Sequence, residues 1–348
     1  MNVNSASTPH LAAVTHPVPQ NTLQNRMKTF IEEATTRLWK CTQTCTNVVI
    51  ADLGCSSEPN AVTLVKTAVD AIFCHCSEHR LKLPEICVLL NDLPDNDFNN
   101  VVKSLAAFQQ NTQSFGPIFT GIVPGSFYKR LFTSNSLHLV LSSNSVNWLS
   151  EVPDELKKNR IPMHDEDEGL RIARRPLVVQ AFARQFRKDF TLFLNMRAQE
   201  LVCTGHMVIS LAGRRSSDYH SIQPWDVPTI PLNDMASRGV ISREMFDSFY
   251  IPLYGPSDKE LTEIIEDEGS FKINNMYMLE RGAEKSLVTP KASALTVRAT
   301  MEPTIVQHFG HSGDVMDEFV RTIEQHISLS GDLIDSLVFL CVSLTKNA

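Results

Sequence analysis

The sequence has no long hydrophobic run, no paired cysteine motif and no excess of positive charge, and each absence excludes a class of protein. No stretch approaches the roughly 18 consecutive apolar residues that a membrane-spanning helix needs. The stretch from Met1 to Gln20 is polar and contains prolines, so it does not look like a signal peptide. We therefore expect a cytoplasmic protein without a membrane partner.

The cysteines indicate neither a disulfide framework nor a zinc site. The densest group of potential metal ligands is Cys74-His75-Cys76 with His79. His75 and His79 are four residues apart and would share a helix face, whereas Cys74 and Cys76 cannot share it. An ordinary helix explains this group better than zinc does.

The charge and composition favour a small-molecule partner. The net charge is −7 and the lysines and arginines are scattered, which argues against nucleic acid, because binding phosphates requires a concentrated positive surface. With 348 residues and 43% hydrophobic content, the chain is able to bury a large core. One large α/β unit and two coupled subdomains are both compatible with this.

Three common cofactor and nucleophile motifs are also missing. No GxGxxG follows the first predicted strand, and neither GxxxxGK[ST] nor GxSxG occurs anywhere. Nicotinamide enzymes, P-loop phosphotransferases and α/β-hydrolases are therefore disfavoured together. S-adenosylmethionine remains a candidate cofactor, because it carries no phosphate and needs no phosphate-binding loop.

Strand and helix patterns alternate along the first half of the chain. Apolar strand-like runs at 47–53, 85–91, 118–123 and 136–142 are separated by helical periodicity at 22–40, 60–79 and 99–110. This alternation predicts an α/β fold, a Rossmann-like, doubly wound and mostly parallel sheet. Beyond Pro153 we expect a helix at 185–202, a strand at 206–211 and a helix at 314–328. The runs 271–279 and 335–345 could form an antiparallel closing pair.

These patterns divide the chain into a core and a cap. The cofactor-binding core is expected at 20–153, continued at 186–212, 266–280 and 311–348. Segments richer in proline, glycine and charge are expected to form a helical cap over the substrate site, at 154–185, 213–265 and 281–310. The amino end, 1–19, is expected to be poorly ordered.

Two acids end the first two predicted strands. Asp52 precedes Gly54 at the end of one buried run, and Asp92 ends the next. Because the carboxyl ends of parallel strands meet at one edge of a sheet, the two acids should share a crevice in which Asp92 accepts the ribose hydroxyls of a nucleoside. The alternative is that each acid only caps the turn that follows it.

Several ordered motifs resemble those of the plant SABATH family of carboxyl methyltransferases, over nearly the whole chain. The motifs are Ile50 to Ser57, Asn91 to Phe98, Val123 to Tyr128, Ser142 to Ser150 and Phe186 to Phe190. The resemblance implies a transferase that methylates salicylate, benzoate, jasmonate or related acids, or xanthine nitrogens, using S-adenosylmethionine. It also implies a homodimer.

The resemblance assigns roles to individual residues. Asp52 and Asn60 would line the methionine end of the cofactor, Asp92 and Leu93 its ribose, and Ser126 with Phe127 its adenine, with Ser142 nearby. Core packing is an equal explanation for Phe127. The residues expected to line the acid site are Gln20, Trp148, Trp225, Asn144 and Asn147.

The implied reaction is a direct displacement in which a carboxylate oxygen attacks the sulfonium methyl group. No general base is required, because a carboxylate is already ionised at neutral pH. Gln20 and Trp148 would orient the acid through N–H donors. Asn144 and Asn147 make the predicted pocket more polar than a salicylate-type pocket, which suggests an acid with an additional hydrogen-bonding group.

Some members of the resembled family also hold magnesium. The pattern places Asn159, Asp247 and Phe249 at the metal, with Tyr250 where the family has a further amide. An ordinary turn explains Asp247 equally well.

Two positions depart from the family pattern. Leu11 to Pro17 lacks the glycines and the Ser-Tyr pair of the family's amino end, and Glu58 replaces a glycine beside the predicted methionine site. A negative charge there would repel the methionine carboxylate. The alternative hypothesis is therefore a catalytically weak or silent relative that keeps the fold and a ligand pocket.

Overall fold

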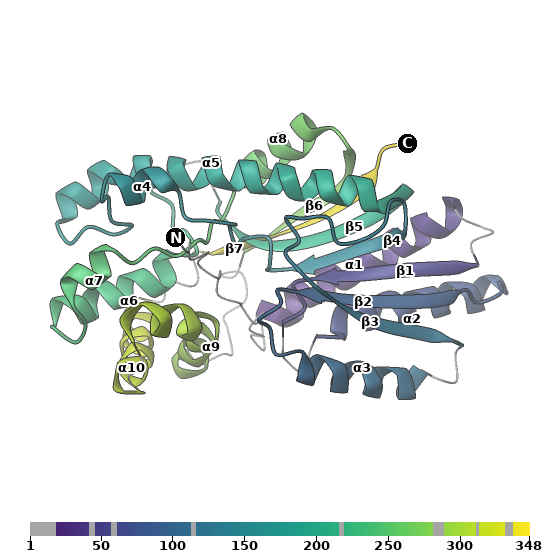
Figure 1. The fold of residues 1–348 in the computed structure, drawn as a ribbon, viewed down its shortest axis with the longest axis horizontal. Coiled ribbons are helices and arrows are strands. Elements are labelled where there is room, and N and C mark those ends of the chain that lie inside the picture. The colour runs from purple at the N-terminus through teal and green to yellow at the C-terminus, as the bar shows by residue number, and fades with distance from the viewer. Residues whose placement is uncertain are drawn as a thin grey trace, which may run out of the picture.

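A seven-stranded sheet forms the centre of the molecule (Figure 1). The computed structural model describes residues 19–41, 46–56, 61–112, 116–215, 219–280, 289–310, 313–330 and 337–348. The strand order is β3-β2-β1-β4-β5-β7-β6. The strands are β1 (Asn47–Leu53), β2 (Glu85–Asp92), β3 (Ile118–Pro124), β4 (Leu137–Ser143), β5 (Leu201–Gly213), β6 (Phe271–Glu280) and β7 (Val338–Lys346).

The first five strands of the sheet are parallel, and β7 runs antiparallel to both β5 and β6. This arrangement confirms the predicted Rossmann-like fold and its antiparallel closing pair. In β4 every residue but the last is buried, as the continuous apolar runs of covered parallel strands predict. Strand β5 begins five residues earlier than expected, at Leu201.

Helices cover both faces of the sheet. Helix α1 packs against α2, β5 and β7, and α3 packs on β3. One hydrophobic cluster joins α1, α2 and α3 to the sheet, and a second joins the other face to the remaining helices. The helices on the first face are α1 (Pro19–Cys41), α2 (Thr63–His79) and α3 (Phe98–Thr112).

The remaining helices pack on the other face of the sheet or beside it. Helices α6, α7, α9 and α10 lie together to one side of the sheet, at the left of Figure 1. The bounds are α4 (Asp154–Lys158), α5 (Glu168–Glu200), α6 (Asp226–Ser237), α7 (Arg243–Asp247), α8 (Asp258–Glu268), α9 (Pro290–Phe309) and α10 (Gly313–Ser330). Among the described residues, no helix is long and apolar enough to cross a membrane.

Helix α5 is longer than the sequence indicated. The expected helix at 185–202 is the second half of one continuous 33-residue helix that begins after the N-cap Asp167, whose side chain accepts the N–H of Leu170. The helix continues through Pro176. The predicted boundary between cap and core, at 185, therefore falls inside a single helix that extends from the cap to the sheet (Figure 1).

Candidate functional site

The turn after β1 packs tightly against the turn after β4. Gly54 has φ +80°, and a Cβ placed on it would lie 2.2 Å from the Oγ atom of Ser145. The Ser145 hydroxyl donates to the Gly54 carbonyl, and the N–H groups of Gly54 and Cys55 both donate to the carbonyl of Asn91. Only glycine fits this position, so the turn brings the ends of β1, β2 and β4 together.

Asp52 and Asp92 lie near the ends of the adjacent strands β1 and β2, but the hydrogen bonds of their carboxylates differ. The carboxylate of Asp92 accepts the N–H of Ser56 at 2.7 Å and that of Leu93 at 2.8 Å. Asp52 is buried, and its Oδ1 atom has no hydrogen-bond partner among the described residues. Burial, followed by the charge of Asp92, raises the pKa of Asp52 to about 8. A cationic ligand placed here would favour the ionised form of Asp52.

The loop after β3 is held by the end of β2. The Asn91 amide donates to the carbonyls of Val123 and Gly125 at 2.7 and 2.8 Å. This places Ser126 and Phe127 beside the predicted ribose site. The half-buried Phe127 ring makes an edge contact with Phe193 of α5 at a centroid separation of 5.7 Å.

Ser142 has a structural partner. Its hydroxyl is fully buried and donates to the Leu53 carbonyl at 2.9 Å, which ties β4 to the end of β1. Its predicted cofactor contact stays a prediction, and this hydrogen bond favours a supporting role.

Trp148 follows the β4 turn and is partly buried. Its N–H donates to the Ser145 carbonyl, and its carbonyl accepts the hydroxyl of Tyr128 at 2.5 Å. A backbone bridge pairs Trp148 with Leu253. The backbone of Trp148 is therefore fixed by three segments that meet at the site.

Trp225 precedes α6 and is fully buried between the rings of Phe182 and Tyr254, with centroids 4.6 and 6.0 Å away. Its indole N–H has no acceptor within the part of the chain that the structure describes. The Nε2 group of Gln223 likewise has no described partner, although Gln223 Oε1 accepts the N–H of Gly255 at 3.3 Å. Sequence reasoning missed Gln223, since a single glutamine two residues from a tryptophan carries no recognisable signal.

The two asparagines predicted to line the acid site, Asn144 and Asn147, differ in the hydrogen bonds of their side chains. Asn144 has φ +54°, a conformation that asparagine tolerates, and its buried Oδ1 atom has no partner among the described residues. Asn147 donates to the carbonyls of Ala212 and Tyr254 and accepts the N–H of Ala212. These three backbone contacts favour a structural role for Asn147 over the predicted contact with a substrate.

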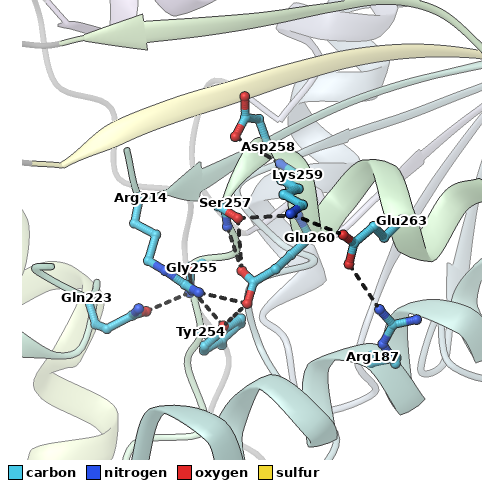
Figure 2. A network of polar contacts seen from close by, with 10 residues as sticks. All are labelled: Arg187, Arg214, Gln223, Tyr254, Gly255, Ser257, Asp258, Lys259, Glu260 and Glu263. Carbon is cyan, nitrogen blue, oxygen red and sulfur yellow. Dashed lines mark hydrogen bonds and ion pairs between the residues drawn. The ribbon is translucent and has the colours of Figure 1, made fainter. Parts of the chain in front are cut away.

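A polar network around the buried Arg214 includes Gln223 and Tyr254 (Figure 2). Arg214 is buried and donates to the Tyr254 hydroxyl at 2.6 Å, to the Gly255 carbonyl at 2.9 Å and to Glu260 at 2.7 Å. Glu260 also completes a capping box with Ser257 at the start of α8. Tyr254 is thereby fixed against Trp225.

The residues predicted to hold magnesium have other contacts in this structure, and their role at a metal stays a prediction. The Asn159 amide donates to the Glu155 carbonyl, Asp247 lies 3.8 Å from Arg243, and Phe249 is buried. The Tyr250 hydroxyl donates to the Ile161 carbonyl at 2.9 Å. Within the described ranges no group of three or more His, Cys, Asp or Glu side chains is arranged to hold a metal ion.

Three residues named in the sequence analysis are not placed. Asn60 and Glu58 lie outside the described residues, and Gln20 lies within α1 by its backbone only. Their predicted roles stay predictions.

Comparisons with known proteins match this chain over most of its length. A family model described as SAM dependent carboxyl methyltransferase matches residues 14–347. A benzoic acid/salicylic acid carboxyl methyltransferase of Petunia hybrida is 40% identical over 75% of this chain and 74% of its own. Jasmonate O-methyltransferase of Arabidopsis thaliana is 36% identical over 83% of each chain. The solved structure of a loganic acid methyltransferase with SAH has a TM-score of 0.78 at 27% identity, over 98% of this chain and 99% of that one.

Proposed function

The chain belongs to the family of SAM-dependent carboxyl methyltransferases, and we propose that it methylates the carboxylate of a small aromatic or hormone-like acid. The observation that supports this most directly is the placement of Asp52, Asp92 and the Gly54 turn together at the carboxyl edge of the parallel strands. It offers acceptors for a nucleoside and a buried carboxyl for a cationic group, without a phosphate-binding loop.

We place S-adenosylmethionine with its methionine amino group toward Asp52, its ribose at Asp92 and Leu93, and its adenine between Ser126 and Phe127. The cofactor supplies an activated methyl group on a sulfonium. A carboxylate oxygen of the acid attacks the methyl carbon as the carbon–sulfur bond breaks, which gives a methyl ester and neutral S-adenosylhomocysteine. No proton moves in this step, so the protein contributes orientation and exclusion of water.

Three buried polar groups at or near the predicted acid-site residues have no hydrogen-bond partner among the described residues, and they support an acid that carries a hydroxyl or carbonyl group besides its carboxylate. The indole N–H of Trp225 and the Nε2 group of Gln223 are donors, and the Oδ1 atom of Asn144 is an acceptor. Buried polar groups of this kind are costly unless a ligand pairs with them. We therefore expect a substrate with a hydroxyl or carbonyl group remote from its carboxylate, in preference to benzoate.

The test is a methyl-transfer assay on a panel of acids with the purified protein and S-adenosylmethionine. The panel contains benzoate, salicylate, jasmonate and loganic acid, together with the methyl ester of each. Methyl transfer to at least one free acid and to no ester supports the proposal. Transfer to none of the acids, with no SAH binding at millimolar concentration in calorimetry, would contradict it.

The same assay separates an active enzyme from a silent relative. If Glu58 repels the methionine carboxylate, Glu58→Gly should raise the affinity for SAH about tenfold, corresponding to roughly 1.4 kcal/mol. Glu78→Gln, a change of one exposed acid on α2, is the control. The comparisons favour the enzyme, because the relatives that they match along this chain are named as methyltransferases.

A homodimer and a cytoplasmic location remain part of the proposal and rest on the family resemblance alone. Light scattering coupled to gel filtration measures the first, and imaging of a fluorescent fusion measures the second. The contacts of the described residues give no support for magnesium, and the proposed displacement requires no metal ion.

A further inference from the structure

We propose that helix α5 positions the cofactor half and the acid half of the site separately, through buried or half-buried charged side chains at different points along its length. This inference rests on the proposed function, because it takes Phe127 as a cofactor contact and Trp148 and Trp225 as acid contacts. The helix has 33 residues and is therefore about 50 Å long. It extends from the cap to the sheet, as Figure 1 shows.

The carboxyl end of α5 holds the loop that carries Phe127. Arg197 and Glu200 are both fully buried and are joined at 2.7 Å. Arg197 donates to the carbonyls of Phe127 and Lys129 at 2.9 and 3.0 Å. It also lies over the ring of Phe193, which contacts Phe127.

Glu200 completes this contact from the other side. Its Oε1 atom accepts the N–H groups of Leu131 and Phe132 at 2.6 and 3.0 Å. One ion pair therefore hydrogen-bonds four backbone groups within a six-residue loop. Arg197 uses three different nitrogens for Glu200 and the two carbonyls, whereas lysine would keep the charge but would have to reach all three partners from one nitrogen.

The amino half of α5 holds the segment that carries Trp225. Arg175 binds both carboxylate oxygens of Asp226, the nearer at 2.5 Å, and donates to the carbonyls of Tyr219 and Ser221. The Oδ2 atom of Asp226 also accepts the N–H of Gln223. The orientation of Trp225 and Gln223 is thus set by a bidentate pair, and not by packing alone.

Between these two points, Asp189 holds the segment that follows Trp148. It is buried and accepts the N–H and the hydroxyl of Ser150 at 2.8 and 2.7 Å, together with the amide of Gln185 at 3.0 Å. Arg197, Asp189 and Arg175 are therefore positioning residues, each acting through the backbone of a different loop.

The experiment uses the same substitution at three points on one helix. Arg197→Lys and Arg175→Lys each disrupt the contacts of one arginine with the segment that it holds. We call these two variants the clamp variants. Arg187→Lys is the matched control, because Arg187 is half exposed and pairs at the surface with Asp267 and with Glu263, the second of which Figure 2 shows. For each variant we measure the Kd of SAH by calorimetry, the KM of the acid that the wild type methylates fastest, and the melting temperature.

Arg197→Lys should raise the Kd of SAH about tenfold and leave the KM of the acid within about twofold. Arg175→Lys should raise the KM of the acid about tenfold and leave the Kd of SAH within about twofold. Arg187→Lys should change neither the Kd nor the KM. The proposal is overturned if both clamp variants weaken SAH and acid equally, or if their losses only follow the fall in melting temperature. If a clamp variant does not fold, Glu200→Asp replaces Arg197→Lys and Asp226→Asn replaces Arg175→Lys.

A ligand-free readout keeps this inference separate from the proposed function. Trp225 is fully buried, so releasing its segment by Arg175→Lys should shift tryptophan emission to longer wavelength. The spectra are compared in a Trp148→Phe background, because the loop that Arg197 holds contacts Trp148 through Tyr128, and there Arg197→Lys should leave emission unchanged. An unchanged spectrum for Arg175→Lys would refute the role of Arg175, whether or not any acid is methylated. If no acid is methylated but Arg175→Lys still shifts the emission, only the proposed function is refuted.

Discussion

Asp52 and Asp92 end adjacent parallel strands, yet Asp92 accepts two backbone N–H groups while the Oδ1 atom of Asp52 accepts none from the described residues. Burial and the charge of Asp92 raise the pKa of Asp52 from 3.8 to about 8. The folded protein therefore keeps a proton on Asp52 that the unfolded chain has lost. Between about pH 4 and pH 8, this group opposes folding more strongly as the pH rises.

This difference predicts a pH-dependent affinity for the cofactor. A cationic methionine amino group next to Asp52 stabilises the carboxylate, so binding should release a proton below pH 8. The affinity for SAH should rise with pH by up to about tenfold per unit and level off near pH 8. Calorimetry in buffers of different ionisation enthalpy measures the number of protons released on binding. Asp52→Asn should abolish both effects, and an equally steep profile in that variant would exclude Asp52 as their source.

The contact between Gly54 and Ser145 predicts a strong effect of a single methyl group. Gly54→Ala would place a Cβ 2.2 Å from Ser145 Oγ in a left-handed backbone, at a cost of about 1–2 kcal/mol for the backbone alone. We expect a lower melting temperature and weaker SAH binding. Adding Ser145→Gly should restore the part due to the clash, and a double variant no better than Gly54→Ala would mean that the backbone conformation dominates.

The unpaired indole N–H of Trp225 predicts a change in substrate preference. Trp225→Phe keeps an aromatic ring between Phe182 and Tyr254 but removes the donor. For an acid with a hydroxyl or carbonyl group besides its carboxylate, the rate should fall about tenfold or more relative to the rate with benzoate. Trp39→Phe is the control, because Trp39 lies on α1 in the hydrophobic cluster that does not contain Trp225. Equal losses on all acids would indicate a packing defect instead.

Trp148 is predicted to act on every acid alike. Its indole N–H is expected to orient the carboxylate, the group that all substrates share. Trp148→Phe should therefore lower kcat/KM by a similar factor for each acid, while the Kd of SAH stays within about twofold. A loss confined to one acid would place Trp148 at a side-chain subsite. Measuring kcat/KM for each acid with Trp148→Phe and with Trp225→Phe compares a uniform loss with a selective one.

The hydroxyl of Tyr250 donates to the Ile161 carbonyl near the positions where a metal was expected. Activity should therefore be unchanged by EDTA and by added magnesium. Tyr250→Phe should lower the melting temperature slightly, since one buried hydrogen bond contributes about 1 kcal/mol. Loss of activity in EDTA, restored by magnesium, would reinstate the ligand set of Asn159 and Asp247.

The core of the fold could be predicted because its signals are local. Continuous apolar runs mark the parallel strands, and the acid that ends each of the first two strands is adjacent to it in the sequence. Helix α5 was harder, because Pro176 and the apolar run at 177–182 interrupt its periodicity. The helix continues because Val178, Val179 and Phe182 are buried against the cap and sheet.

The sequence alone determined the order of the strands along the chain and of the first three helices, the two acids at the strand ends and the resemblance to a methyltransferase family. Only the tertiary structure decided which polar groups are already paired. Asn147 proved to bind backbone 65 and 107 residues away, while Arg197 proved to bind a loop 68 to 70 residues earlier. Such contacts depend on how distant segments meet, because each is a hydrogen bond formed in a buried space that the chain creates only when folded.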